Sequence, residues 1–366
     1  TSSTSTNLPG TLNSNSGGQD GLIVKFSSNL NNVIWARYHG GTGIDAIYSL
    51  KITNDNRVVV GGGTRSFSNF PTNIYGLGQT RSSSFPIKNS AISNPGTGQF
   101  IVKLNPNLDS LIMSTTFGSG NRINISPTAF LVDRCLNIYV SGWGGNIAFN
   151  NDTTFGEERK ILPASMPLSN DAFRTTTNGN DFYLYVINGN TDSLFYGSFF
   201  GGLTSDDHVD GGTSRFDKNG IIYQSVCASC GLNNRTDFPT NNGLFNRVNS
   251  NNCNNAIFKM DFQILPTANF GVDQSAICLN EANNDTIILL ITDRSIRSDI
   301  TTWNFNGDTV ITSFSDTTIF ITSAGNYFIR QEIQDTICAA GDFIETLIQV
   351  RPDNIQLSTI ADTNIC

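Results

Sequence analysis

Four cysteines in the middle of the chain have types and a spacing that suit metal binding, thiol exchange or structural disulfides. Cys227 and Cys230 form a Cys-x-x-Cys pair, Cys253 follows further on, and Cys135 is the one plausible fourth ligand of a zinc site. A redox-active pair needs a helix N-terminus that lowers a thiol pKa, whereas the surrounding sequence predicts strand and turn. We therefore expect structural disulfides among these four cysteines, and the sequence leaves their pairing open.

An acidic cluster before a predicted strand is a candidate calcium site. Asp206, Asp207 and Asp210 offer carboxylate oxygens, the ligands that calcium prefers, around His208. Their spacing differs from that of an EF-hand loop, and the two glycines after Asp210 equally suit a tight turn. A solvated or turn-capping cluster is therefore the alternative interpretation. Calcium is the one cofactor that the sequence indicates.

Catalytic chemistry has little support in the residue types. His208 suits a general base, but the chain contains no Gly-x-Ser-x-Gly nucleophile motif. A glycosidase needs two carboxyl groups, yet Glu157 and Glu158 are the only glutamates of the front region, in a segment typical of a surface loop. Among the three tryptophans, Trp143 lies between glycines and is the best candidate for stacking on a sugar.

The composition excludes several classes of partner. The chain has 366 residues and a net charge of −8, and only 14% of its residues are charged. It has neither the basic patches of a nucleic-acid binder nor an apolar stretch long enough to span a membrane. Residues 264–366 have a net charge of −9, whereas residues 1–263 are nearly neutral at +1. We therefore expect an extracellular, all-β protein with two regions of different surface.

Internal repeats organise the front region. A turn followed by a strand, a Phe-Pro-Thr element and an aromatic–glycine segment each recur, and the last kind sets a period of about 80 residues. The first full period contains four β-prone runs, which are Ala46–Ile52, Val58–Gly62, Phe100–Leu104 and Leu111–Phe117. Four antiparallel strands in each repeat are typical of a β-propeller blade. We therefore expect residues 1–263 to form a partial β-propeller.

These motifs resemble the SBBP-repeat β-propeller region of large cell-surface proteins that gliding bacteria export by type IX secretion. The resemblance covers residues 1–263, and it is carried by Gly18–Phe26, the two Phe-Pro-Thr elements, Tyr139–Gly145 and His208–Asp217. It implies a role in adhesion, gliding or extracellular filament architecture. It also implies the type IX secretion machinery as a partner during export, and an extracellular or cell-surface location.

The acidic back region predicts a β-sandwich. Short strands separated by turns at intervals of about 10–15 residues are typical of an Ig-like fold. The predicted strands are Ile287–Ile291, Thr301–Asn306, Thr317–Ile321, Tyr327–Ile333 and Ile344–Val350. Trp303 followed by Gly325-Asn326-Tyr327 resembles the PKD-type sandwich, in which a buried Trp precedes a Gly-x-Tyr strand. We expect this domain to span residues 264–352, and residues 353–366 to begin a further Ig-like module.

The remaining cysteines belong to this back region. Cys278 and Cys338 flank the predicted strands, and we expect them to form a disulfide across about 60 residues that contributes about 3–4 kcal/mol. The chain has seven cysteines, so at least one has no partner within it. Residues 361–366 repeat the pattern of the segment that ends at Cys278, which indicates Cys366 as the odd one.

Together these features predict a non-catalytic segment of a large secreted or cell-surface protein. Its expected partners are glycans of the cell surface or environment, or other surface proteins, bound by loops at one end of the propeller. Two alternatives stay open. A propeller-based polysaccharide hydrolase or lyase would cleave a substrate, and an extracellular filament subunit would self-assemble.

Overall fold

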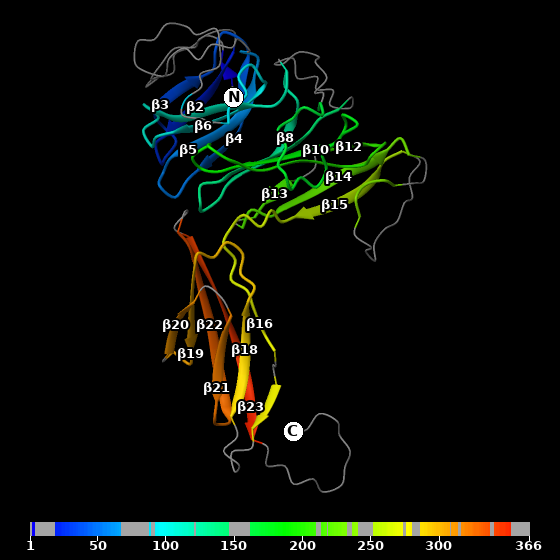
Figure 1. The fold of residues 1–366 in the computed structure, drawn as a ribbon. Coiled ribbons are helices and arrows are strands. Elements are labelled where there is room, and N and C mark those ends of the chain that lie inside the picture. Colours follow the sequence, from blue (N-terminus) through cyan, green and yellow to red (C-terminus); the bar gives the residue numbers. More distant parts are fainter. Residues whose placement is uncertain are drawn as a thin grey trace. The chain divides into compact units, whose positions relative to one another are not determined.

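The computed structural model consists of β-strands joined by turns and loops (Figure 1), which confirms the all-β prediction. It describes residues 2–3, 19–66, 88, 92–120, 122–145, 162–209, 214–217, 219–232, 236–240, 252–273, 276–279, 286–307, 309–313, 316–336 and 340–352. The chain divides into two compact units, Thr1–Phe262 (unit 1) and Gln263–Cys366 (unit 2). Within these described ranges, no helix is long and apolar enough to cross a membrane.

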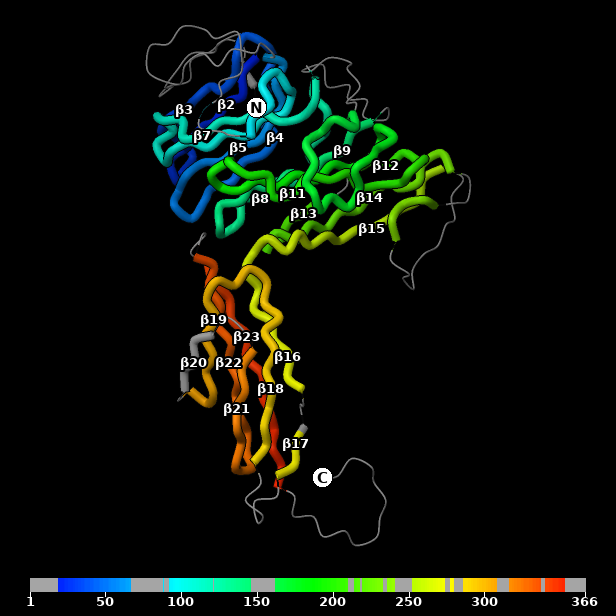
Figure 2. The backbone as a smooth tube through the Cα atoms, in the orientation of Figure 1, coloured from blue at the N-terminus to red at the C-terminus, as the bar shows by residue number. Residues whose placement is uncertain are grey.

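Unit 1 contains four sheets, which follow one another along the chain (Figure 2). The first sheet contains β1 (Ser2–Ser3), β2 (Asp20–Phe26) and β3 (Val33–His39). The second contains β4 (Asp45–Ile52), β5 (Val58–Thr64), β6 (Gln99–Leu104) and β7 (Leu111–Phe117). The third contains β8 (Ser126–Val132), β9 (Ile138–Trp143), β10 (Phe182–Ile187) and β11 (Leu194–Phe200). The fourth contains β12 (Asp206–His208), β13 (Ser214–Phe216), β14 (Ile222–Cys230) and β15 (Asn254–Met260).

The strand pairing repeats from sheet to sheet. In the second and third sheets, four consecutive strands pair antiparallel with their neighbours in chain order. In the fourth sheet, β12 and β13 both pair with β14, and β15 pairs with β14 as well. The four runs predicted for the first full period form β4, β5, β6 and β7. The prediction of four antiparallel strands in each full repeat is confirmed for these two sheets.

Two kinds of turn recur, and they explain much of the sequence repetition. One precedes β5, β9 and β14, and its fourth residue has a positive φ; its copies are Thr53–Arg57, Asp133–Asn137 and Asp217–Ile221. The other precedes β3, β7 and β11, and its fourth residue also has a positive φ; its copies are Ser27–Asn32, Asn105–Ser110 and Asn188–Ser193. Side-chain oxygens of Asn, Ser and Asp accept backbone N–H bonds in these turns. The polar composition therefore follows from the repeated turns.

Apolar layers lie between neighbouring sheets of unit 1. Between the first and second sheets, Ile23 and Trp35 pack against buried residues of β5 and β6. Between the second and third, the rings of Phe117 and Tyr185 stack with centroids 4.3 Å apart. Between the third and fourth, the ring of Phe258 lies 4.6 Å from that of Phe200. Each pair of neighbouring sheets thus shares its own apolar contact.

Unit 2 contains two sheets. One contains β16 (Phe270–Val272), β18 (Ile287–Asp293) and β21 (Thr317–Ile321). The other contains β17 (Ala276–Leu279), β19 (Ile300–Phe305), β20 (Thr309–Ser313), β22 (Gly325–Asp335) and β23 (Ala340–Pro352), with β17 parallel to β23. The five predicted strands correspond to β18, β19, β21, β22 and β23, whereas β16, β17 and β20 were not predicted.

A single apolar core joins the two sheets of unit 2. Trp303 is fully buried at its centre, with Leu289 and Ile291 from the smaller sheet and Ile329 and Ile348 from the larger one. The unit is therefore a two-layer arrangement that encloses one core.

Candidate functional site

The structure resolves one disulfide among the four central cysteines. Cys230, the last residue of β14, is bonded to Cys253, which directly precedes β15, with Cα atoms 4.1 Å apart. Cys135 is also disulfide-bonded, and Cys227 is a half-buried thiol. The expectation of a structural disulfide is confirmed for Cys230–Cys253, which links β14 to the start of β15.

A buried histidine lies beside this disulfide. His208 Nδ1 is 3.6 Å from Cys230 Sγ, and ligand atoms of His208, Cys230 and Cys253 all lie within 4.8 Å of one another. The pairing of β12 with β14 brings His208 here, whereas the sequence suggested only Cys135 as a further zinc ligand. In the oxidised state the two sulfurs are not thiolates, so the group is a metal site only after reduction.

Trp143 takes part in this packing. Its ring lies 5.7 Å from that of His208, and only 9% of the residue is exposed. The suggestion that Trp143 stacks on a sugar is therefore wrong for this structure, because its ring is covered by the fourth sheet.

The predicted pairing of Cys278 with Cys338 involves a residue outside the described ones, which is Cys338. Cys278, in β17, is disulfide-bonded and lies opposite Arg351 of β23.

Two members of the predicted calcium cluster, Asp206 and Asp207, lie among the described residues, and Asp210 lies outside them. Asp207 accepts backbone N–H bonds at both carboxylate oxygens, whereas Asp206 interacts with Asn180 and His208. In the part of the chain that the structure describes, Asp206 and Asp207 do not form a metal-type group with a third ligand. Neighbouring residues of a strand point to opposite faces, so these two carboxyl groups have different surroundings.

Asp207 belongs instead to a repeated contact between neighbouring sheets. In each case a polar residue at or directly before the start of β2, β6 or β10 faces a polar residue at or near the first strand of the next sheet. We call these contacts inter-sheet pairs, and they are Asp20–Asp45 (first), Gln99–Asn124 (second) and Asp181–Asp207 (third). All six residues are at most 3% exposed.

A glycine marks each inter-sheet pair. A Cβ atom added at Gly40 would lie within 2.6 Å of an oxygen of Asp20 and of an oxygen of Asp45. A Cβ atom added at Gly118 would lie within 2.6 Å of side-chain atoms of Gln99 and Asn124. A Cβ atom added at Gly201 would lie within 2.7 Å of an oxygen of Asp181 and of an oxygen of Asp207. The two facing side-chain atoms of each pair are therefore at most about 5 Å apart. Any residue larger than glycine would collide with both of them. The aromatic–glycine repeats in the sequence owe their glycines to this approach.

Each pair also receives the same backbone bond. The N–H of the residue after the glycine donates to the second member of the pair. The three bonds are Gly41 N to Asp45 Oδ2, Ser119 N to Asn124 Oδ1 and Gly202 N to Asp207 Oδ2. The second member is therefore the hydrogen-bond acceptor in every pair.

Burial raises the pKa of the carboxyl groups in these pairs. The pKa of Asp45 rises to about 6 and that of Asp181 to about 6, in both cases through desolvation. Desolvation raises the pKa of Asp207 to about 7, and the charges of Asp181 and Asp237 add to the effect. Such values suit a general acid, but these groups are at most 1% exposed, so a dissolved polysaccharide does not reach them.

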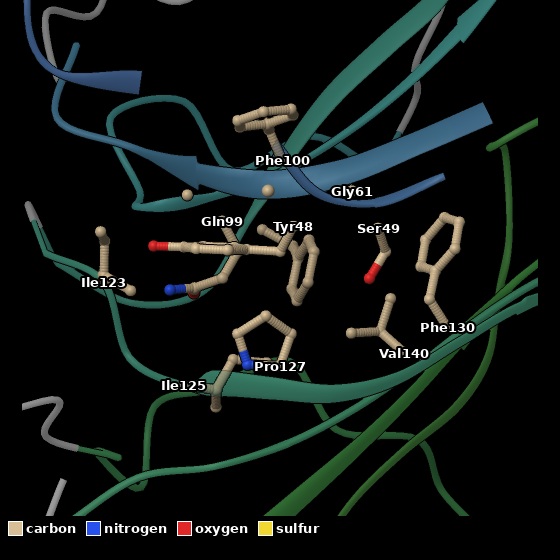
Figure 3. Close-up of a pocket in the computed structure, with 13 residues that line it drawn as sticks. Tyr48, Ser49, Gly61, Gln99, Phe100, Ile123, Ile125, Pro127, Phe130 and Val140 are labelled. Atoms are coloured by element: carbon tan, nitrogen blue, oxygen red, sulfur yellow. The ribbon is translucent and has the colours of Figure 1, made fainter. Parts of the chain in front are cut away.

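A small pocket also lies between the second and third sheets (Figure 3). Apolar side chains line most of it, including Tyr48, Phe100, Ile125 and Phe130. At Gly61 an added Cβ atom would lie 3.0 Å from the ring of Phe130, so the glycine makes room for that ring. We assign this pocket to the packing between the two sheets.

Comparison with known proteins adds no family assignment, since no protein-family model and no curated protein matches the chain significantly.

Proposed function

We propose that the chain is a non-catalytic segment of a large secreted or cell-surface protein that serves in adhesion or extracellular architecture. In this proposal, unit 1 is a partial β-propeller of SBBP type and unit 2 a PKD/Ig-like sandwich, exported by type IX secretion. The inter-sheet pairs carry the proposal, because the same buried contact joins each sheet of unit 1 to the next. A rigid array of this kind presents loops and edges without needing a reactive centre.

The cysteines support an extracellular location. Cys230–Cys253 is a disulfide and Cys135 and Cys278 are disulfide-bonded too, and such bonds persist in oxidising compartments. The carboxyl groups with raised pKa values support a structural role, because they are buried between sheets.

Binding and cleavage assays on the same preparation test this function. The full chain is applied to an array of bacterial and environmental glycans, and it is incubated with the polysaccharides that it binds. The proposal predicts saturable binding to a class of glycan without any new reducing ends. Reproducible cleavage would contradict it and favour the hydrolase or lyase alternative. Filaments seen by electron microscopy, with no glycan binding, would favour an architectural subunit.

A further inference from the structure

The three inter-sheet pairs differ in charge. Both members are carboxyl groups in the first and third pairs, and both are amides in the second. The two positions therefore change together within one chain, as expected of side chains that bond to each other. Two buried carboxylates at this distance repel, unless a proton or a cation lies between them.

The second pair shows which of these two solutions the geometry suits. In the orientation of the Gln99 amide that satisfies its hydrogen bonds, with its O and N exchanged, the NH2 group donates to Asn124 Oδ1 at 3.2 Å and the oxygen accepts from the backbone N–H of Asn124 at 2.6 Å. The O–H of a protonated aspartic acid donates to a carboxylate as an amide N–H donates to an amide oxygen. Replacing both carboxyl groups of a pair by amides removes the charged ligands of a cation site. The same replacement preserves a hydrogen bond between the two side chains.

The third pair identifies the acceptor. Both oxygens of Asp207 are already bonded to backbone donors, Oδ2 to Gly202 N–H and Oδ1 to Ser229 N–H, the latter at 2.8 Å. Donors at both oxygens stabilise the ionised form of a carboxyl group. Burial raises the pKa of Asp207 further than that of Asp181, but both oxygens of Asp207 have backbone donors, whereas Oδ1 of Asp181 has none among the described residues. On this hydrogen bonding we assign the carboxylate of the pair to Asp207.

Asp181 has the complementary arrangement. Its Oδ2 accepts from Thr177 Oγ1 and, at 3.2 Å, from Asn178 N–H. Its Oδ1 is buried, and no hydrogen bond from any described residue reaches it. That atom lies beside Asp207 Oδ2 at Gly201. A proton on Oδ1 satisfies this buried oxygen and removes the repulsion in one step.

We propose that the Asp181–Asp207 and Asp20–Asp45 pairs each hold one shared proton at mildly acidic pH, and that these protons hold neighbouring sheets of unit 1 together. Asp181 and Asp20 donate, and Asp207 and Asp45 accept. The second pair makes the same connection with an amide, so two of the three contacts between sheets depend on pH and one does not. This inference does not depend on the proposed function.

Charged groups around the third pair favour the shared proton. Asp237 approaches Ser205 and Gly202, and hydrogen bonds from Ser205 and Thr204 outweigh its desolvation and lower its pKa, so it stays ionised. Its negative charge opposes a second charge on the pair. Arg174 acts in the opposite direction on Asp181, more weakly than burial does.

The first pair has a different neighbour. His39, next to Gly40, is fully buried, and desolvation together with the charge of Arg37 lowers its pKa to about 3. It is therefore uncharged at neutral pH and does not neutralise a second carboxylate. Gly41 N–H and the Ser66 hydroxyl donate to Oδ2 of Asp45, and the Thr64 side chain also hydrogen-bonds this carboxyl group.

The sign of the pH dependence follows from linkage. Asp45, Asp181 and Asp207 have higher pKa values in the folded chain than the ordinary 3.8. At a pH between the ordinary and the folded-state values, the folded state therefore binds more protons than the unfolded state. Their contribution to stability is complete below pH 3.8 and is lost as the pH rises through about 6 to 7.

Thermal unfolding of the full chain between about pH 4 and about pH 8 tests the proposal. Three variants are compared with the wild type: Asp20→Asn/Asp181→Asn, which supplies amide donors; Asp109→Asn, a control at an exposed turn of unit 1; and Gln99→Glu/Asn124→Asp, which introduces an acidic second pair. Each measurement is repeated with calcium chloride and with a chelator.

The proposal predicts that the unit 1 midpoint of the wild type falls as the pH rises across this range. The Asp20→Asn/Asp181→Asn variant has a flatter profile, Asp109→Asn follows the wild type, and Gln99→Glu/Asn124→Asp has a steeper profile. An unchanged profile in Asp20→Asn/Asp181→Asn would overturn the proposal. So would a midpoint that calcium raises in the wild type and not in that variant, because the pairs would then bind a cation.

Discussion

Units 1 and 2 join their sheets in different ways. In unit 1, polar pairs at the ends of strands connect one sheet to the next, beside separate apolar layers. In unit 2, two sheets share one apolar core around Trp303. A series of small, repeated contacts spreads the stabilisation along unit 1, whereas unit 2 concentrates it in one apolar core. The two units should therefore respond to different perturbations.

The largest expected effect is in unit 2. Trp303→Ala removes a fully buried ring from the core, and we expect a loss of about 3–5 kcal/mol. Hydrogen exchange should show lost protection in β18 and β22 and unchanged protection in β6 and β10. Phe320→Ala, at a position 68% exposed, is the control and should change stability by less than about 0.5 kcal/mol. Equal loss of protection in both units would contradict the conclusion that the core around Trp303 stabilises unit 2 alone.

The second effect is confined to unit 1. Replacing both Cys230 and Cys253 by Ser opens a disulfide with a sequence separation of 23, which should destabilise unit 1 by about 3 kcal/mol. The unit 2 transition should not move in calorimetry. Cys227→Ser, which leaves the disulfide intact, is the matched control.

A smaller effect tests the glycines at the inter-sheet pairs. Gly40→Ala places a methyl group against Asp20 and Asp45, and we expect a loss of about 1–3 kcal/mol in unit 1. Denaturant unfolding should show this loss, whereas Ser110→Ala at an exposed position should change stability by less than about 0.5 kcal/mol. Similar losses of stability in Gly40→Ala and Ser110→Ala would contradict the role of Gly40 in the close approach of Asp20 and Asp45.

The smallest effect contrasts the pH responses of the two units. Asp293 accepts bonds from Ser295, Thr301 and Gln331, which outweigh its desolvation and lower its pKa. Its contribution is present above pH 3.8 and is lost as the pH falls through the folded-state value. Calorimetry in acid should therefore show unit 2 weakening with falling pH, and less so in Asp293→Asn. A unit 2 midpoint that instead rises in acid would contradict the stabilisation of ionised Asp293 in the folded chain.

The strands were predictable because their signals are local. Alternating apolar residues and turn residues identified β4 to β7, and β18, β19, β21, β22 and β23. The inter-sheet pairs were not predictable, because Asp181 and Asp207 meet only when two sheets pack together. The sequence instead grouped Asp207 with its neighbour Asp206. The glycine repeats were the available signal, but their reason is a contact that only the three-dimensional arrangement shows.

Infrared spectroscopy tests the central claim most directly, because the C=O stretch of a protonated carboxyl group is distinct from that of a carboxylate. The spectrum of the full chain at mildly acidic pH is compared with that of Asp20→Asn/Asp181→Asn. We predict a protonated-carboxyl band that is stronger in the wild type than in the variant and that disappears from the wild type at alkaline pH. Equal bands in the wild type and the variant at mildly acidic pH would contradict the shared protons.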